Sequence, residues 1–205
     1  MPNPFESGLT RYLKPEQLRT TQAQRIGIAG AGGLGSNAAV ALVRTGFKNF
    51  EILDRDVVEA SNLNRQDYVS ADIGKPKVEL LTARLKAINP DVFVVTHQAE
   101  WTRANAGSFF QGFPILVEAF DKAEIKRDFV EWASVNAGVV VSGNGMAGLT
   151  GGDPTAIKHT GNIYIIGDGT TSITDGHPPL APRVVQCAAK MAEVVLRLTL
   201  DLPII

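Results

Sequence analysis

Cysteine is almost absent from this sequence of 205 residues, since Cys187 is the only one. A single thiol excludes an intramolecular disulfide framework and a zinc site made of four thiolates. Aromatic residues make up only 7% of the chain, and the net charge is −1. A charge so near zero gives no field that would attract nucleic acid or an anionic membrane. We therefore expect neither as a partner.

Long apolar runs are also missing, because none approaches the roughly 18 residues that suggest a membrane-spanning helix. The first residues, Met-Pro-Asn-Pro-Phe-Glu, lack the basic and apolar regions of a secretory signal. We therefore expect a cytoplasmic protein. Its 44% hydrophobic and 20% charged residues are typical of a soluble globular chain.

The pattern of apolar residues predicts strands alternating with helices along residues 25–142. Strands are expected over residues 25–29, 49–53, 92–95, 115–117 and 139–141, and helices over residues 36–45, 77–87, 102–110 and 122–136. Strands separated by helices favour a parallel sheet that is covered on both faces.

The alternation of strands and helices ends at Gly143. Residues 156–159 and 163–166 predict a hairpin about residues 160–162, and a Gly/Thr/Asp-rich loop over residues 167–176 leads to a helix over residues 183–200. We predict an α/β fold, a Rossmann-like doubly wound and mostly parallel sheet with a C-terminal antiparallel hairpin and a final helix. We expect a single domain over residues 1–205, made of an N-terminal helical arm (1–24), a Rossmann-like part (25–142) and a C-terminal part (143–205).

A glycine-rich loop follows the first predicted strand and reads Gly-Ala-Gly-Gly-Leu-Gly at residues 30–35. Gly30, Gly32 and Gly35 have the spacing that brings a phosphate close to the free N–H groups of a helix N-terminus. Asp54 ends the next apolar stretch, where an acceptor for a ribose hydroxyl is expected. At this point a dinucleotide such as NAD remains possible.

Polar and charged residues follow several predicted strand ends, where ligands bind in an open parallel sheet. Asp54, Asp56, Asp121 and Gly143 belong to this rim, and the segment 61–77 lies on the same side. Arg65 lies in a run of amide and hydroxyl side chains with almost nothing apolar to pack. Such a run offers donors to a polyanion, although most single Arg and Lys residues are solvated surface charges.

These motifs together resemble the ThiF/MoeB/HesA adenylyltransferases, relatives of ubiquitin-activating enzymes. The resemblance runs through residues 30–36, 54–56, 61–66, 73–79, 88–90, 118–121 and 181–183, and is nearest to the short ThiF-type branch without zinc cysteines. It implies that the chain activates the C-terminal glycine carboxylate of a ubiquitin-like sulfur carrier protein ending in Gly-Gly. The products would be an acyl-adenylate and pyrophosphate, in thiamine thiazole biosynthesis.

The resemblance also implies roles for individual residues, with ATP and Mg²⁺ as cofactors and no zinc. Catalysis would depend on Arg65 and Lys77 at the phosphates and on Asp121, which would hold Mg²⁺. The ATP site would comprise Gly30, Gly32, Gly33, Gly35, Asp54, Asp56, Asn62, Asn64, Arg65, Lys77, Asp121 and Lys122, where Lys122 replaces the usual Asn. Arg11 or Lys14 would contact the phosphates of the partner subunit in a homodimer.

The chemistry of the residues agrees with adenylation. A carboxylate with a pKa of about 3.5 is already ionised at neutral pH, so the attack needs no general base. Three alternatives remain: an NAD-dependent oxidoreductase, a non-catalytic partner-binding subunit, and an enzyme that adenylates a modified tRNA nucleoside. Cys187 lies on an apolar helical stripe, so we predict that it packs in the core, and we predict packing roles for Trp101 and Trp132.

Overall fold

The computed structural model describes residues 3–171 and 176–205. In it the chain forms one seven-stranded sheet in the order β3-β2-β1-β4-β5-β7-β6. The strands are β1 (Arg25–Ala29), β2 (Asn49–Leu53), β3 (Phe93–His97), β4 (Ile115–Glu118), β5 (Val139–Gly143), β6 (Ile157–Thr160) and β7 (Ile163–Ile166). Every neighbouring pair is parallel except β6–β7, which is antiparallel. The predicted fold class, including the C-terminal hairpin, is confirmed.

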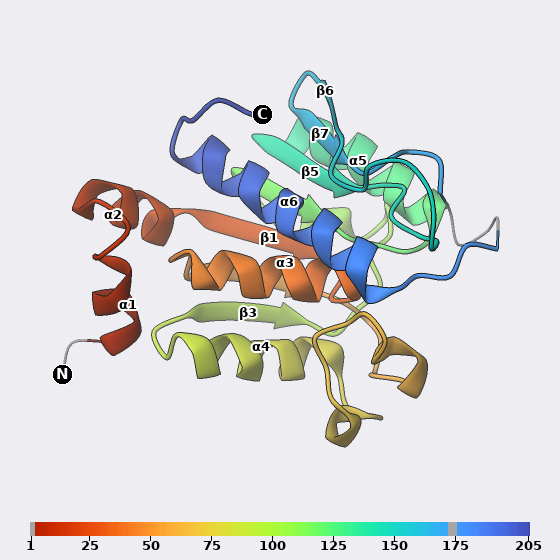
Figure 1. Cartoon of the computed structure of the whole chain (residues 1–205), viewed down its shortest axis with the longest axis horizontal. Helices are drawn as coiled ribbons and strands as arrows, with labels where there is room; N and C mark the ends of the chain where they lie inside the picture. The colour runs from red at the N-terminus through yellow and green to blue at the C-terminus, as the bar shows by residue number, and fades with distance from the viewer. Residues whose placement is uncertain (1–2, 172–175) are drawn as a thin grey trace.

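Helices cover both faces of this sheet (Figure 1). They are α1 (Pro4–Leu9), α2 (Pro15–Ala23), α3 (Gly33–Arg44), α4 (Lys77–Ile88), α5 (Ala123–Asn136) and α6 (Ala181–Thr199), with 3-10 turns η1 (Ala60–Asn62), η2 (Ser70–Asp72) and η3 (Ala106–Ser108). In the view of Figure 1, α3, α4 and α6 lie in front of the sheet and α5 behind it. Across the described residues, none of these helices is both long and apolar enough to span a membrane.

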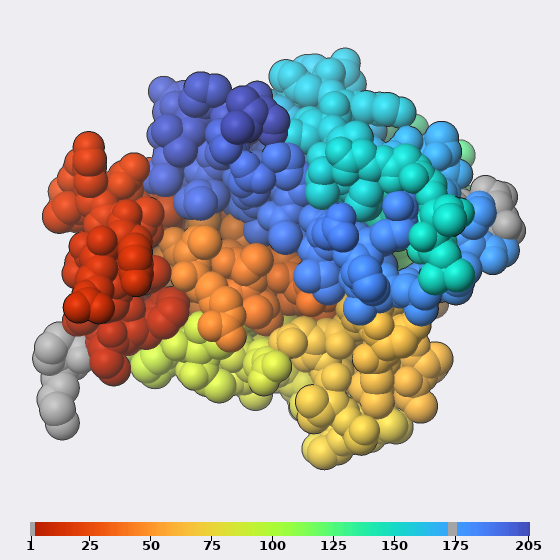
Figure 2. Space-filling model, in the orientation of Figure 1, coloured from red at the N-terminus to blue at the C-terminus, as the bar shows by residue number. Residues whose placement is uncertain are grey.

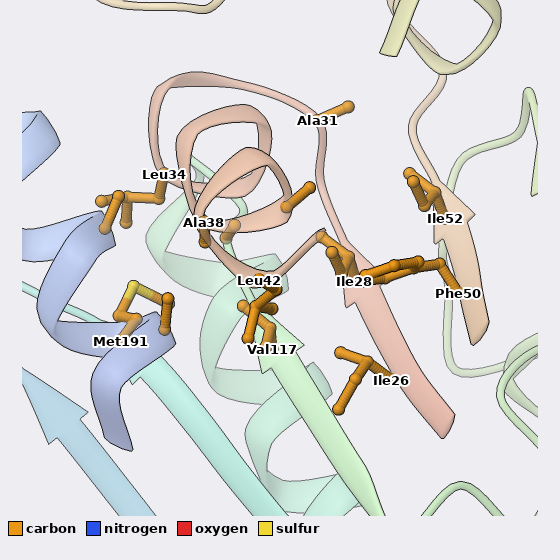
Figure 3. Packing of buried hydrophobic residues seen from close by; sticks show 14 of the residues in the cluster. Ile26, Ile28, Ala31, Leu34, Ala38, Leu42, Phe50, Ile52, Val117 and Met191 are labelled. Carbon is orange, nitrogen blue, oxygen red and sulfur yellow. The ribbon is translucent and has the colours of Figure 1, made fainter. Parts of the chain in front are cut away.

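The front layer is held by aliphatic side chains from the sheet and from α3, α4 and α6. Figure 3 shows Leu34 of α3 pointing toward α6, which carries Met191, while Ile28 and Phe50 project from the sheet. On α6 the buried residues recur every three or four positions, so one face of the helix packs on α3. Cys187 belongs to this face and is fully buried, which confirms the prediction that it lies in the core.

The back layer is aromatic and differs from the sequence prediction in one place. The helix predicted over residues 102–110 is wrong, because only the short turn η3 forms there. Phe110 has a positive φ of 58° and buries its ring against Phe129, while its N–H donates to Glu51. Burial of neighbouring Phe109 and Phe110 in one cluster overrides the local preference for a helix.

Trp101 also belongs to the back layer. Its ring lies edge-on to Phe129, with centroids 5.2 Å apart, and 6.0 Å from the ring of Trp132. Both tryptophans therefore pack in this layer as predicted, but Trp101 also lines the cavity at the carboxyl ends of the strands.

The strand order creates a crevice at one end of the sheet. From β1 the chain proceeds outward through β2 and β3, and it then returns to the other side of β1 with β4 and β5. In an open sheet of this kind, ligands bind where the order reverses, beyond the carboxyl ends of the strands. Figure 2 shows the segment between β2 and α4, in gold, as a lobe beside the blue start of α6 at this end. A loop is predicted over residues 167–176, and its residues 172–175 lie outside the described residues.

Candidate functional site

A cavity of about 430 Å³ lies at the carboxyl ends of β1, β2, β4 and β5. Its walls come from segments far apart in the sequence: the glycine loop, the residues after β2, the start of α4, the turn into α5 and the loop after β5. Many of the residues predicted for the ATP site line it together, namely Gly30, Gly32, Gly33, Asp54, Asp56, Arg65, Lys77, Asp121 and Lys122.

The glycine loop takes its shape from two close backbone approaches. Gly30 has a φ of +103°, and a Cβ at this position would lie 2.7 Å from the carbonyl oxygen of Ala119. A Cβ on Gly35 would lie 1.8 Å from the carbonyl oxygen of Gly30. Gly35 does not line the cavity, so glycine is required there for the turn into α3 rather than for direct contact with a ligand.

Asp54 connects this loop to the end of β2. One carboxylate oxygen accepts the N–H of Ala31 at 2.6 Å and the other accepts the N–H of Asp56 at 2.7 Å. Burial raises the pKa of Asp54 above its ordinary value, although these two hydrogen bonds act in the opposite direction. Each oxygen keeps acceptor capacity for a further donor, as the predicted contact with a ribose hydroxyl would require.

Lys77 is the first residue of α4 and is almost entirely buried in the cavity wall. Its Nζ lies 3.2 Å from Oδ2 of Asp56, and its backbone N–H donates to the Asp56 carbonyl oxygen. The hydroxyl of Tyr68 lies next to Lys77 and donates to the carbonyl oxygen of Ala31, in the glycine loop, at 2.8 Å. The ammonium is thereby held at one place beside the glycine loop.

Arg65 and Asp121 face the same space from different elements. The Arg65 guanidinium donates to the Ser61 carbonyl oxygen at 3.0 Å and to the Asn64 side chain at 2.8 Å. Burial lowers the pKa of Arg65, and the charge of Asp121 opposes that shift. Arg65 comes from the lobe between β2 and α4, and Asp121 follows β4, so only the folded chain brings the two charges together.

Besides Gly35, two predicted ATP-site residues, Asn62 and Asn64, do not line the cavity. The Asn62 side chain accepts the N–H of Glu59 at 3.1 Å, closing the turn η1. Asn64 donates to the carbonyl oxygen of Pro179 at 2.9 Å and thereby joins the lobe to the segment before α6. Asn64 supports Arg65 through its side chain, and Asn62 accepts the N–H of Arg65 with its backbone carbonyl oxygen; neither residue lines the cavity.

Arg11 and Lys14 lie far from the cavity of their own chain. Both are exposed in the connection between α1 and α2, and α2 ends next to the amino end of β1. Figure 1 shows this arm at the opposite end of the sheet from the carboxyl ends of the strands. Within one chain, neither side chain belongs to the cavity wall.

Several residues that line the cavity were not predicted from the sequence. Lys126 lies five residues after Asp121 and one turn beyond Lys122 on α5, and this i, i+4 spacing is the signal that places both lysines on one helix face. Arg55 and Glu100 also line the cavity and form an ion pair at 2.6 Å. Nothing in the local sequence connects these two, because they follow different strands.

The residues present fit a magnesium ion that is bound chiefly by the nucleotide. No cluster of three or more His, Cys, Asp or Glu residues suited to a metal exists among residues 3–171 and 176–205. Asp121 is an exposed carboxylate on the cavity wall. Magnesium commonly uses one or two protein carboxylates and takes its other ligands from phosphate and water, so one Asp is a sufficient donor here.

Comparisons with known proteins identify the family of this chain and several relatives. The sequence model of the ThiF family matches residues 8–189. The tRNA threonylcarbamoyladenosine dehydratase of Haemophilus influenzae is 30% identical over 153 residues, which is 74% of this chain and 58% of that protein. An adenylyltransferase and sulfurtransferase of Aspergillus terreus is 37% identical over 108 residues, 52% of this chain and 22% of that one. The chain therefore spans little more than half the length of the dehydratase.

A solved structure gives the same fold. The Escherichia coli tRNA N6-threonylcarbamoyladenosine dehydratase, crystallised in complex with ATP, has a TM-score of 0.84 at 22% identity. The match covers 97% of this chain and 94% of that one. Because the family model matches most of its residues, the chain belongs to the ThiF family.

Proposed function

We propose that this protein uses ATP to adenylate a carboxylate, and that the carboxylate belongs to a modified nucleoside of tRNA. The observation that carries the adenylation proposal is the single cavity in which the glycine loop meets Arg65, Lys77 and Asp121. An NAD-dependent oxidoreductase gives no role to these three charges. A non-catalytic subunit would not need to keep them.

The reaction requires an anion to approach a polyanion. A carboxylate oxygen attacks the α-phosphorus of ATP, the bond from that phosphorus to the bridging oxygen breaks, and pyrophosphate leaves. The carboxylate is already ionised, so no proton has to be removed. Fixed positive charge is what the transition state needs, and Arg65 and Lys77 supply it on the proposed phosphate side. Magnesium held by Asp121 would neutralise further charge on the phosphates.

The tRNA substrate rests on the relatives. The dehydratase of Haemophilus influenzae matches 74% of the chain, whereas the sulfurtransferase relative matches 52%. Adenylation also fits a dehydration. AMP becomes the leaving group when a second nucleophile on the same molecule attacks the acyl carbon, and it carries away the carboxylate oxygen. The near-neutral charge of the whole chain stands against a large tRNA footprint, so we confine the proposed contact to the region of the cavity.

The second candidate substrate is the C-terminal glycine of a ubiquitin-like sulfur carrier, as in thiamine thiazole biosynthesis. It is the function that the sequence resemblance implies. The 37% identity to the adenylyltransferase and sulfurtransferase supports it, as does the 36% identity over 108 residues to the SAMP-activating enzyme E1 of Haloferax volcanii. Both candidates share the adenylation step and differ in the molecule that carries the carboxylate.

Pyrophosphate exchange into ATP separates these candidates. The protein is incubated with ATP, labelled pyrophosphate and either tRNA carrying threonylcarbamoyladenosine or a carrier protein ending in Gly-Gly. The matched controls are the same tRNA without the modification and the carrier without its last glycine. Exchange that depends on the modified tRNA supports the proposal, and exchange that depends on the carrier supports the second candidate. Binding of NAD without binding of ATP, measured by calorimetry, would contradict both.

A further inference from the structure

A buried carboxylate lies at the end of β4, behind the cavity wall. Glu118 has no exposed surface. Its Oε1 accepts the N–H of Phe120 at 2.7 Å, and its Oε2 accepts the hydroxyl of Ser142 at 2.6 Å. Glu118 and Ser142 are register partners on β4 and β5. A buried charge of this kind requires a cation, because removing an ion from water costs several kcal/mol.

Lys126 is that cation. It projects from the second turn of α5, and its Nζ donates to Oε2 of Glu118 at 2.5 Å and to the carbonyl oxygen of Gly143 at 2.9 Å. One ammonium therefore ties the ends of β4 and β5 to α5. The contacts hold Lys126 in one place, so little conformational entropy would be lost if it bound a ligand.

The ammonium retains capacity for one more acceptor. Lysine carries three N–H donors, and the described residues accept two of them. The Lys126 side chain remains 19% exposed, and the residue lines the cavity. A buried ion pair that served the fold alone would need no open side toward the cavity.

The cavity has two halves that differ in their polar groups. Over β1 and β2 it is lined by the glycine loop, Asp54 and Lys77, the half assigned above to the nucleotide. Over β4 and β5 it is lined by Lys126, Thr171 and residues 143–147. The nearby Arg183 guanidinium is engaged by Asp168 at 2.7 Å and by the carbonyl oxygens of Ala147 and Gly152. Lys122 also lines the cavity beside β4 but is exposed, so Lys126 is the cation of this half that buried acceptors hold in place.

We propose that the third N–H of Lys126 binds the carboxylate that is to be adenylated, in a subsite over the ends of β4 and β5. The inference rests on the proposed adenylation function and adds a residue to it. In this position the ammonium offsets the repulsion between the carboxylate and the phosphates while leaving one carboxylate oxygen for attack. Glu118 acts through Lys126 and positions it.

The test requires a variant that folds. Lys126→Met alone would leave Glu118 charged and buried, so the test variant is Glu118→Gln/Lys126→Met, which removes both charges and keeps the side-chain volumes. The matched control is Ser142→Ala, which removes one hydrogen bond to Glu118 and leaves the ammonium in place. Lys126→Arg tests rescue, because it retains the positive charge. Circular dichroism and thermal unfolding verify that each variant is folded.

Two measurements distinguish the carboxylate from the α-phosphate as the bound anion. ATP affinity is measured by calorimetry without the second substrate, and the KM of the carboxylate substrate is measured in pyrophosphate exchange. One charge-assisted hydrogen bond corresponds to about a 10- to 100-fold effect. We expect the double variant to raise that KM by this factor while its Kd for ATP stays within about twofold, and we expect Lys126→Arg to recover part of the loss. Ser142→Ala should lower stability and leave both constants unchanged.

Three results would overturn the inference. If Kd for ATP rises as much as the KM of the carboxylate substrate, Lys126 serves the nucleotide. If neither constant changes in the double variant, the ion pair is structural only. If Ser142→Ala raises KM as much as the double variant does, the effect comes from the fold and not from the ammonium. A wild-type protein that exchanges no pyrophosphate with either substrate would instead contradict the proposed function itself, and this is visible before any variant is made.

Discussion

Single side chains in the cavity have different surroundings, and these decide what each can do. Arg65 is positioned by the Ser61 carbonyl oxygen and Asn64, and Lys77 by Asp56. A cation held in this way needs no reorganisation when charge develops on the phosphates, which is why such groups have large effects on rate.

We therefore expect Arg65→Ala and Lys77→Ala each to slow pyrophosphate exchange by roughly 10²–10³-fold, the scale of one preorganised donor. Circular dichroism should show an unchanged fold. Suitable controls are Arg84→Ala, which removes an exposed ion pair to Asp67, and Lys75→Ala, an exposed neighbour of Lys77. Rates in the Arg65 and Lys77 variants that match those of the controls would show that both are ordinary surface charges.

Cys187 illustrates the opposite case, a reactive side chain in an inert environment. Burial raises the pKa of its thiol to about 12, so the thiol stays protonated at neutral pH and is a poor nucleophile. The sulfur lies 3.5 Å from the carbonyl oxygen of Ile166, and Cys187 does not line the candidate cavity.

We predict that Cys187→Ala leaves pyrophosphate exchange unchanged and lowers the free energy of unfolding by about 1–2 kcal/mol through a small core cavity. A thiol reagent should modify the denatured protein quickly and the native protein slowly. Fast modification of the native protein, or a variant that still forms the adenylate but no longer transfers sulfur, would refute the core assignment.

At the scale of elements, one ion pair joins α6 to the loops above the cavity. Arg183, in the first turn of α6, donates to Asp168 and to the carbonyl oxygens of Ala147 and Gly152. Burial by itself would raise the pKa of Asp168, but hydrogen bonds from the backbone and side chains of Thr171 and Thr170 lower it well below its ordinary value. Thr171, which is hydrogen-bonded to Asp168, lines the cavity. The Arg183–Asp168 ion pair therefore helps to position the cavity wall at Thr171.

The shift predicts a pH dependence of stability. A carboxyl whose pKa is lower in the folded state stabilises the protein above the unfolded pKa, and this contribution is lost as pH falls below about 4. Asp168→Asn should lower the free energy of unfolding at pH 7 by about 3 kcal/mol and reduce its change between pH 5 and pH 3. Urea unfolding across this range measures both. The control is Asp128→Asn in an exposed ion pair, and equal behaviour of the two variants would refute the role of Asp168.

At the scale of the whole molecule, the cavity and the N-terminal arm lie at opposite ends of the sheet. Arg11 and Lys14 are exposed on the arm, so any contact of theirs with bound phosphates must come from a second copy of the chain. The apolar residues Val185, Leu202 and Ile205 are exposed on or just after α6, which favours the symmetric homodimer that the resemblance implies.

A complementation experiment tests that dimer. Subunits carrying Arg11→Ala/Lys14→Ala are mixed with subunits carrying Arg65→Ala, after brief dissociation and reassociation. If the arm acts in trans, each mixed dimer contains one site with both defects and one intact site, so exchange activity should rise above that of either parent. Absence of rescue would contradict the shared site. A monomer in analytical ultracentrifugation would contradict the dimer as well.

The sequence alone determined the features that depend on local periodicity and spacing. The strand beginning at Arg25, the turn at Gly30 and the amphipathic α6 all have signals within a few residues, because backbone geometry and one-sided burial act locally. The mostly parallel sheet and the C-terminal hairpin followed from those elements and the rules that connect them.

Only the tertiary structure decided the features that depend on distant partners. Residues 102–110 form no helix because Phe110 packs against Phe129 and bonds to Glu51. Asn62 and Asn64 turn away from the cavity because their amide groups close a turn and bind Pro179. Lys126 is held at the cavity because its ammonium pairs with Glu118, which is buried at the end of β4. Spacing along the chain does not record these contacts, since each is made only after strands from different parts of the sequence have come together.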